Sequence, residues 1–462
     1  MVPRLSPGEV AAHLPAAPPE EAEDLDRILD DYEWLIEPNV THWNHPGFLA
    51  YFAITGSGPG IVGEALASAL NVNAMLWKTS PAATELEERV CGWLRDMLGL
   101  PAVFAGHIND TASIGSLLAL AAARHRAAPQ ARERGLVGGA AMTVYCSDQA
   151  HSSIDKAVMT LGLGLDQLRH IGTDDAFRLD VDALRTAVEA DLEAGLRPIA
   201  VVAVAGTTSS TSVDPIAAVA EVAAAHGLWL HVDAAYAGSA AICPELRPLL
   251  AGWERADSIV VNPHKWLFTP IDCSVLFVRD PEELKATFSL VPEYLKTGEE
   301  RVTNLMDLGI QLGRRFRALK LWMVIRAFGV RGLREAIRHH CALAAELAGR
   351  IDAHPEIERV APVPFSTVCF RWTPPGTPEE QDAANELLLA EVNAAGPVHL
   401  SHTRLAGRLV LRVAIGNLRT EREHVDHAWR LVLEAVDRLR SGAGWRTPPL
   451  RDREPGSTLG ER

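Results

Sequence analysis

The sequence predicts an α/β fold built on a mostly parallel sheet with helices covering both faces. Two observations predict it. From about residue 110 onward, short runs rich in β-branched residues alternate with Ala- and Leu-rich stretches of helical character. The strand-like runs are also almost continuously apolar, which is typical of strands buried on both faces of a parallel sheet. With 462 residues, the chain is long enough to form two or three lobes.

The expected elements follow in chain order. Residues 20–100 have mostly helical character with Gly and Pro breaks, and strands are expected at 141–147, 198–206, 228–234, 258–262 and 273–278. Helices are expected at 180–196 and 215–227, because apolar residues recur there at helical spacing and a glycine marks the end. A long helix at 312–329 is expected to lead into a smaller C-terminal lobe.

Composition excludes several classes of protein. The net charge of −15 argues against a nucleic-acid partner, since phosphate binding needs clustered Lys and Arg. Six cysteines without a C-x-x-C pair suit reduced thiols in a cytoplasm. The N-terminus lacks a signal-peptide or transit pattern, and no apolar run approaches the ~20 residues that span a bilayer. A cytoplasmic protein with no membrane partner is expected.

Ionisable and polar side chains directly follow four of the expected strands. Ligands of open α/β sheets bind at the carboxyl ends of the strands, so these residues are expected to meet at one edge. Each of them alone has a structural explanation; Asp233, for instance, is well placed to cap the next helix. Together they bring a carboxylate, two imidazoles, a lysine and hydroxyls to one place: His151, Thr208, Asp214, Asp233, Tyr236, His264 and Lys265.

Lys265 is the most informative of these residues. It stands in "VVNPHKWLF" (260–268), where both flanks favour burial, although lysine is rarely buried without a partner. A lysine can form a Schiff base with a carbonyl compound, and a carboxylate can keep a pyridine nitrogen protonated. Thr111, Ala112 and Ser113 precede a clear helix, whose N-terminus can bind a phosphate, although an ordinary helix cap explains them as well. This set matches the demands of pyridoxal phosphate.

Several motifs in a fixed order carry a family resemblance over roughly residues 20 to 440. They are "THWNHPGFLAYF", "SPAATELEERVCGWL", "DTAS", "DQAHSSIDKA", "HVDAAYAGSA", "NPHKWL", "PEYLK" and "LGRRFRALKLW". With them the chain closely resembles the group II pyridoxal-phosphate-dependent amino-acid decarboxylases, specifically the aromatic-L-amino-acid decarboxylase branch. The resemblance implies the type I pyridoxal-phosphate fold, which is aspartate-aminotransferase-like and has a seven-stranded sheet. It also implies an intertwined homodimer with active sites at the subunit interface.

The family fold implies a division of the chain. We expect a helical N-terminal segment (1–90) that packs on the partner subunit, and a large cofactor-binding α/β domain (91–335). A small α+β C-terminal domain (336–442) should follow. The Pro-, Gly- and charge-rich tail at 443–462 is expected to be disordered.

The resemblance also implies roles for individual residues. Lys265 resembles the Schiff-base lysine, Asp233 the partner of the pyridine nitrogen, and His151 the imidazole stacked on the cofactor ring. The other implied cofactor contacts are Ala235 on the opposite ring face, Ala112 and Ser113 in the phosphate turn, Thr208, and His264 beside the phosphate. Tyr294, in "VPEYLK", resembles the loop tyrosine that returns a proton to the substrate carbon. Lys265, Tyr294, His151 and Asp233 are therefore the expected catalytic set.

The substrate is expected to be an aromatic L-amino acid, with a branched aliphatic one open. Trp43, Tyr51 and Phe52 match the aromatic wall of the family. Asn73 and Met75 depart from it at positions that face the substrate of the partner subunit, and Ala53, Ile54, Leu305 and Leu308 depart as well. Family members with Phe or Asn in place of the catalytic tyrosine or histidine release an aldehyde. Tyr294 and His151 therefore favour the amine, with the aldehyde as the alternative.

Three other interpretations are less favoured. A metal site built from His42, His45 and the histidines at 339–340 has few matching carboxylates, so no metal is expected. An aminotransferase needs an arginine for the substrate carboxylate, and the arginines of "GRRFR" (313–317), Arg314, Arg315 and Arg317, keep that alternative open. A non-catalytic binding protein on the same fold is disfavoured, because Lys265, Asp233, His151 and Tyr294 occur together.

Overall fold

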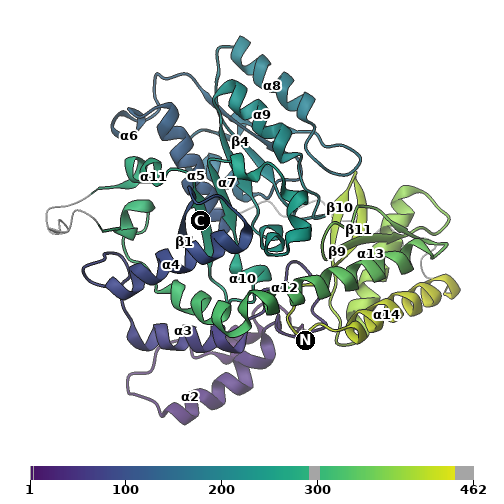
Figure 1. Cartoon of the computed structure of the whole chain (residues 1–462). Coiled ribbons are helices and arrows are strands. Elements are labelled where there is room, and N and C mark those ends of the chain that lie inside the picture. The colour runs from purple at the N-terminus through teal and green to yellow at the C-terminus, as the bar shows by residue number, and fades with distance from the viewer. Residues whose placement is uncertain (1, 4, 291–301, 443–462) are drawn as a thin grey trace.

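The computed structural model describes residues 2–3, 5–290 and 302–442, and its centre is a seven-stranded sheet (Figure 1). The strand order is β1-β7-β6-β5-β4-β2-β3. Five neighbouring strands are parallel, whereas β7 runs antiparallel to both of its neighbours. The strands are β1 (Ala105–Asn109), β2 (Met142–Ser147), β3 (Leu168–Ile171), β4 (Arg197–Val204), β5 (Trp229–Asp233), β6 (Ser258–Val261) and β7 (Ser274–Val278).

The five strands expected from the sequence correspond to β2, β4, β5, β6 and β7. The mostly parallel α/β sheet is thereby confirmed. β1 and β3 were not predicted, because "AGHIN" and "LRHI" are short and half polar. Both strands end up in the sheet through pairing with β7 and β2, which is a tertiary effect.

Helices cover both faces of this sheet, and the side chains along each strand alternate between two apolar cores. On β4, Val201 and Ala203 pack into one core while Ala200 and Val202 pack into the other. The first core lies under α4 (Pro81–Leu98), α8 (Val181–Glu193), α9 (Ile216–His226) and the start of α12 (Arg317–Asp352). The second lies under α5 (Ala112–Ala127), α7 (Ser153–Thr160) and α11 (Pro281–Phe288).

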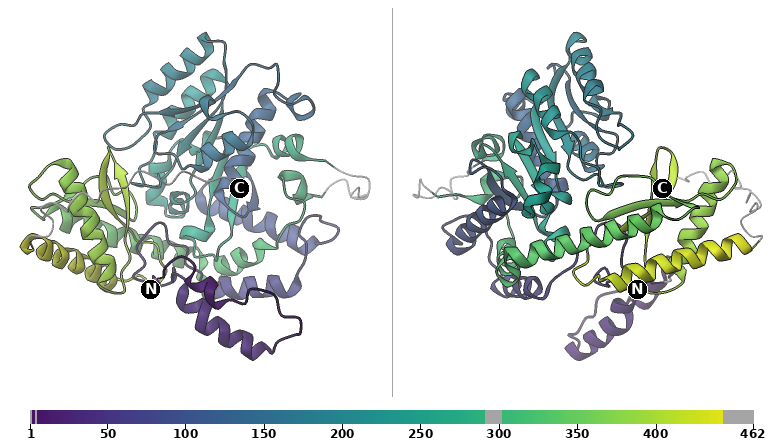
Figure 2. Two further views of the ribbon diagram at one scale, coloured as in Figure 1. Left: turned by 180° about the vertical axis from the view of Figure 1, so that it is seen from behind. Right: turned by 45° about the vertical axis from the view of Figure 1, so that its right-hand side comes forward.

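A second, antiparallel sheet follows in the chain, with order β10-β11-β9-β8. Its strands are β8 (Ile357–Arg359), β9 (Thr367–Trp372), β10 (Ser401–Leu405) and β11 (Arg408–Ala414). It packs on α13 (Pro378–Ala394), α14 (Arg422–Ser441) and the end of α12 around one apolar core. Figure 2 shows α12 reaching from the layers of the large sheet to this smaller one.

The long helix α12 differs from the expected one at both ends. It begins at Arg317 rather than residue 312, because the backbone N–H of Arg314 donates to the Asn73 side chain instead of joining a helix. It also continues to Asp352, although Gly329 interrupts it with φ 63° and ψ 166°, a conformation that glycine tolerates.

The expected domain limits fall inside helices of the structure. The limit at 335/336 lies in α12, and the limit at 90/91 lies in α4, whose Val90 and Leu94 are part of the core of the large sheet. The division itself stays a prediction. The tail at 443–462 lies outside the described residues.

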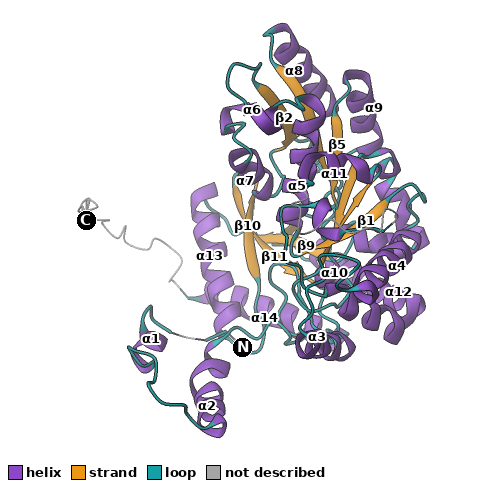
Figure 3. Ribbon diagram, turned by 90° about the vertical axis from the view of Figure 1, so that its left-hand side faces the viewer, coloured by secondary structure: helices purple, strands orange, loops and turns teal. Residues whose placement is uncertain are grey.

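The N-terminal helices lie on the outside of the molecule. α1 (Glu9–His13) and α2 (Leu25–Asp31) bury none of their residues and stand apart from the large sheet (Figure 3). α3 (Gly58–Leu70) buries only two, Gly60 and Gly63. A Cβ on Gly63 would lie 2.6 Å from Cα of Lys320, so glycine at this position lets α3 pack directly against α12.

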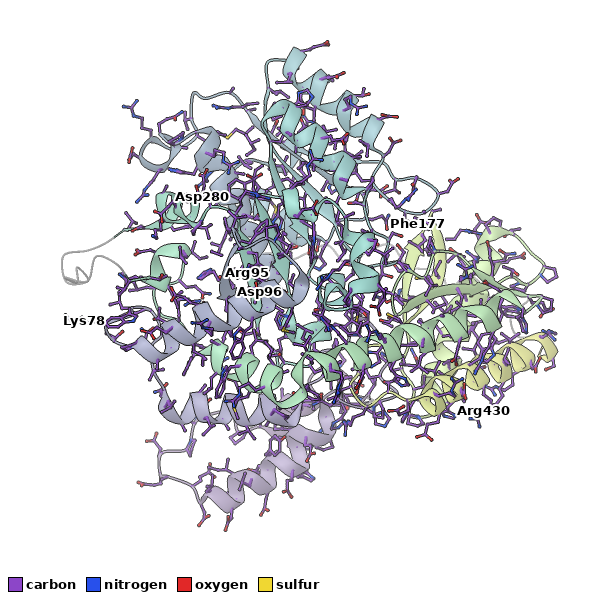
Figure 4. The ribbon with its side chains drawn as sticks, in the orientation of Figure 1. Lys78, Arg95, Asp96, Phe177, Asp280 and Arg430 are labelled. Carbon is purple, nitrogen blue, oxygen red and sulfur yellow. The ribbon has the colours of Figure 1, made fainter. Side chains whose placement is uncertain are left out.

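The described surface is well supplied with charge. Arg95 and Asp96 of α4 pair at 2.8 Å, Asp280 caps α11 by accepting from the N–H of Glu282, and Lys78 lies exposed on the loop before α4 (Figure 4). The short helices α6 (Ala131–Arg134) and α10 (Pro263–Trp266) complete the α-helices. Among the described residues, no helix is long and apolar enough to cross a membrane.

Candidate active site

The predicted cofactor residues meet at the carboxyl edge of the parallel strands. Asp233 ends β5, His151 and Thr208 follow β2 and β4, and Lys265 follows β6 on α10. A cavity of about 200 Å³ opens at this edge. All eight predicted cofactor contacts line it: Ala112, Ser113, His151, Thr208, Asp233, Ala235, His264 and Lys265.

Lys265 is presented to this cavity by a short, firmly anchored helix. Its neighbours His264 and Trp266 are buried, whereas Lys265 is half-buried. Burial lowers the pKa of Lys265, the carboxylate of Asp233 opposes that shift, and Arg412 adds to it. The lowered pKa increases the fraction of unprotonated amine, which is the form that attacks a carbonyl carbon.

Asp233 is positioned to pair with a protonated pyridine nitrogen, the role predicted for it from the sequence. Its carboxylate is buried, and Oδ1 accepts the backbone N–H of Ala235 at 3.1 Å. A buried carboxylate at the floor of a cavity can stabilise a cationic ring nitrogen through a charge-assisted hydrogen bond.

Hydrogen bonds from the backbone fix the protonation of both predicted histidines. Nδ1 of His151 accepts the N–H of Ser153 at 3.1 Å, and Nδ1 of His264 accepts the N–H of Cys273 at 3.0 Å. An atom that accepts from an amide carries no proton of its own, so each imidazole is neutral with its proton on Nε2. Burial agrees with this assignment, because it lowers the pKa of His151 and lowers that of His264 to about 3.

The N-terminus of α5 provides an anion site at the same cavity. Thr111 is the N-cap residue but its side chain caps no backbone N–H. The N–H groups of Ala112 and Ser113 have no acceptor among the described residues. Free N–H groups at the start of a 16-residue helix attract a phosphate through hydrogen bonds and the helix dipole.

A second cavity of about 520 Å³ adjoins the first and shares Lys265 and His151 with it. The predicted residues Trp43, Tyr51 and Phe52 line it. The rings of Trp43 and Tyr51 stack at 5.5 Å, which forms an aromatic wall. Sequence reasoning missed the residues that the C-terminal sheet adds to this cavity, Ser401, His402, Thr403 and Arg412, because no motif marks them.

Arg412 is the arginine that the structure places in this cavity. The arginines suspected from the sequence are engaged elsewhere: Arg314 pairs with Glu87, and Arg315 and Arg317 pair with Asp272. Arg412 is buried, its Nε donates to the carbonyl of Ser209 at 3.0 Å, and its Nη2 has no partner among the described residues.

Asn73 and Met75 lie away from both cavities around Lys265. Oδ1 of Asn73 accepts from the N–H of Arg314 at 2.9 Å, and its Nδ2 contacts Sδ of Met75 at 3.3 Å. Within one chain they therefore do not meet the aromatic wall. Tyr294 lies outside the described residues. The part of the chain that the structure describes contains no cluster of three potential metal ligands.

The donor set fits pyridoxal phosphate. An available amine, a buried carboxylate, a neutral imidazole and a free helix N-terminus surround one cavity, and Oδ1 of Asn262 there has no partner within the described residues. A mostly parallel α/β sheet with this set at its carboxyl edge defines a pyridoxal-phosphate enzyme.

Comparisons with known proteins identify the family. Residues 7–373 match the family model described as the pyridoxal-dependent decarboxylase conserved domain. The chain is 42% identical to phenylacetaldehyde synthase of Arabidopsis thaliana (94% of this chain, 91% of that protein). It is 43% identical to tyrosine decarboxylase 4 of Petroselinum crispum (94% and 88%).

A solved structure supports the same family. The fold superposes with a TM-score of 0.92 on Oryza sativa TDC with PLP and tryptamine, at 40% identity and covering 95% of this chain and 93% of that one. The chain therefore belongs to the pyridoxal-dependent decarboxylase family, and it is a pyridoxal-phosphate-dependent amino-acid decarboxylase.

Proposed function

We propose that this chain decarboxylates an aromatic L-amino acid and releases the corresponding amine and CO₂. The observation that carries this proposal is the junction of the two cavities. The cavity lined by the eight cofactor residues opens, at Lys265 and His151, into the one walled by Trp43 and Tyr51. Tyrosine and tryptophan decarboxylases among the relatives support the aromatic substrate.

In this proposal Lys265 would hold the cofactor, Asp233 would keep its ring nitrogen protonated, and His151 and Ala235 would lie on either side of its ring. Ala112 and Ser113 would bind its phosphate, His264 would lie beside the phosphate, and Thr208 would be a further cofactor contact. The bound cofactor supplies an electron sink for the pair left behind when CO₂ departs. Tyr294 returns a proton to the substrate carbon. Arg412, beside Lys265, orients the amino acid through its carboxylate.

The alternative product is an aldehyde, formed by decarboxylation coupled to oxidative deamination. A phenylacetaldehyde synthase of 42% identity favours this alternative. We favour the amine because the chain has both His151 and Tyr294. A branched aliphatic substrate is the second alternative, which Ile54 and Ile271 on the wall of the larger cavity support.

We also propose a homodimer with active sites at its interface. Large apolar side chains of α2 and α3 are exposed, among them Leu25, Ile28, Ile61 and Leu66, and contiguous exposed apolar surface is typical of an interface. In a dimer, Asn73 and Met75 of one subunit would line the substrate cavity of the other. All six cysteines are unpaired, which supports a reducing compartment, the cytoplasm.

Product analysis tests the reaction. The purified protein, supplied with pyridoxal phosphate and air, is incubated with each of the twenty amino acids and with dihydroxyphenylalanine, and products are identified by mass spectrometry. We expect an amine and CO₂ from tyrosine, tryptophan, phenylalanine or dihydroxyphenylalanine. Aldehyde with ammonia and peroxide would favour the alternative reaction, and no product from any aromatic amino acid would contradict the proposed substrate class.

Lys265→Ala tests the attachment site. This variant should lose turnover and should no longer retain cofactor after borohydride reduction. Lys285→Ala, which removes an exposed lysine paired with Glu282, is the control and should behave as the wild type. Full activity in Lys265→Ala would refute the assignment.

Tyr294→Phe tests the proton donor. The variant should shift the product from amine toward aldehyde, because the substrate carbon loses its acid. The amine-to-aldehyde ratio is measured by mass spectrometry, and an unchanged ratio would remove Tyr294 from the mechanism.

A further inference from the structure

Three aromatic rings stack behind the cavity of Lys265. Phe52 lies on Tyr236 with ring centroids 3.9 Å apart and planes 15° apart. Tyr236 lies on Trp266 at 4.6 Å and 9°. We call Phe52, Tyr236 and Trp266 the ring stack. Its members come from the N-terminal segment, the residues after β5, and α10, so the stack joins three parts of the chain.

Hydrogen bonds fix the rear of the ring stack. Nε1–H of Trp266 donates to Nδ1 of His340 at 3.0 Å. Nδ1 is therefore unprotonated, and Nε2–H of His340 donates to the carbonyl of Asn417 at 3.1 Å. The hydroxyl of Tyr236 contacts Oγ of Ser366. Since all these groups are buried, the plane of Phe52 is set by a rigid support.

Two cations lie over the other face of Phe52. Nζ of Lys265 is 5.2 Å from the ring centroid, and Cζ of Arg412 is 4.5 Å from it. Tyr236 covers one face at 3.9 Å, so both cations share the opposite face. Among the described residues, Nζ of Lys265 contacts the ring of Phe52 and is attracted by the more distant charge of Asp233.

Both faces of Phe52 are thus occupied, and only its edge can meet a substrate. We propose that Phe52 is a positioning residue: supported by the ring stack, it holds the unattached ammonium of Lys265 on its π face, beside the guanidinium of Arg412. The inference rests on the proposed attachment of the cofactor to Lys265. The attraction of an ammonium to a ring quadrupole adds to the attraction of the Asp233 carboxylate, with which Nζ forms no direct ion pair.

The held ammonium must lose a proton to solvent before it reacts. With the cofactor bound, Nζ would supply the lone pair for a C=N bond to the aldehyde carbon, and the aldehyde oxygen would leave as water with the two remaining amine protons. Besides Lys265, seven ionisable side chains line the two cavities: Asp233 from β5, Arg412 from β11, His402 from β10, Tyr51, Tyr236, and His151 and His264 at the edge of the sheet. Asp233 and the Phe52 face stabilise the ammonium, whereas burial and Arg412 destabilise it.

Removing the ring should therefore lower the pKa of Lys265. A cation–π contact of this kind corresponds to about half a pKa unit to one unit. Phe52→Leu keeps an apolar side chain but no π face, and Phe52→Met serves the same purpose if the leucine variant does not fold. Phe52→Tyr keeps an aromatic π face, so the pKa of Lys265 in this variant should equal the wild-type value.

Phe365→Leu is the matched control. Phe365 is buried and packs edge-on against Trp266 at 6.3 Å, so its loss disturbs the ring stack without touching either cation. If Phe52 had only a structural role, Phe52→Leu and Phe365→Leu would change the pKa of Lys265 by the same amount. If Phe52 holds the ammonium, only Phe52→Leu should change the pKa of Lys265.

The pKa is measured on the cofactor-free protein, from the pH dependence of the rate at which it captures pyridoxal phosphate, followed by visible absorbance. We expect a pKa lower by about half a unit to one unit in Phe52→Leu, and wild-type values in Phe52→Tyr and Phe365→Leu. An unchanged or raised pKa in Phe52→Leu, or the same shift in Phe365→Leu, would overturn the inference. Lys265→Ala is run in parallel, and borohydride-stable capture by it would instead refute the proposed attachment site.

Discussion

Arg314 and Glu87 form the most deeply buried ion pair among the described residues. This pair joins the large sheet to the segment that contains Asn73. Nη2 of Arg314 lies 2.7 Å from Oε1 of Glu87, and the two side chains are 3% and 2% exposed. Glu87 also accepts the N–H of Ile108 on β1. We predict that Glu87→Gln, which keeps the shape and removes the charge, destabilises the protein strongly.

The magnitude follows from what the substitution leaves behind. Removing one partner of a buried pair costs about 3 to 5 kcal/mol, because the other charge stays in the interior. Arg314 keeps two carbonyl acceptors, Ile108 and Ala74, so we expect the lower limit, about 3 kcal/mol. At about 2 °C per kcal/mol for a domain of roughly 250 residues, Tm falls by about 6 °C.

Thermal and urea unfolding of the cofactor-loaded protein measure this loss. Glu88→Gln, an exposed neighbour on the same helix, is the control and should stay within ~0.5 kcal/mol of wild type. In a double-mutant cycle, Glu87→Met with Arg314→Met should cost less than the sum of the single changes by about 1 to 3 kcal/mol. A loss below ~1 kcal/mol for Glu87→Gln, or strict additivity, would refute the reasoning.

Two further predictions concern pH and assembly. Burial lowers the pKa values of His231 and His340 to about 4 and that of His264 to about 3; below pH ~6.5 the unfolded chain therefore binds protons that the folded one does not, and stability falls by about 1.4 kcal/mol per pH unit for each group. Burial also lowers the pKa of His107 well below its usual value, so that it adds a fourth group. Asp214, with a pKa raised to about 6, acts oppositely between pH ~4 and 6, so urea unfolding should show a net loss equal to about three groups; His340→Gln should reduce that slope by one group, and an unchanged slope would contradict the assignment. If the proposed dimer forms through α2 and α3, Leu66→Glu on α3 should give a monomer by light scattering, whereas Leu192→Glu on α8, equally exposed at 48% against 47%, should not; a dimer in both variants would place the interface elsewhere.

Sequence reasoning could bring His151, Asp233 and Lys265 together because each of them follows a strand of the parallel sheet, whereas their roles toward the cofactor stay predictions. Once β2, β4, β5 and β6 are recognised, their carboxyl ends must share one edge, and residues such as His151, Asp233 and Lys265 meet there without further information. The strands themselves are recognisable because burial on both faces demands an apolar run.

The sequence alone thus determined the fold class, the family and the residues that meet at one sheet edge, since local patterns and short motifs encode them. Only the tertiary structure decided which arginine lines the larger cavity beside Lys265. Arg314, Arg315 and Arg317 stand in a motif yet are paired with carboxylates from distant segments, whereas Arg412 stands in none and reaches the cavity from another sheet. The ring stack was likewise decided only by the tertiary structure, because Phe52 and Trp266 stand more than two hundred residues apart in the chain. Contacts of this kind depend on packing between elements, which no local pattern records.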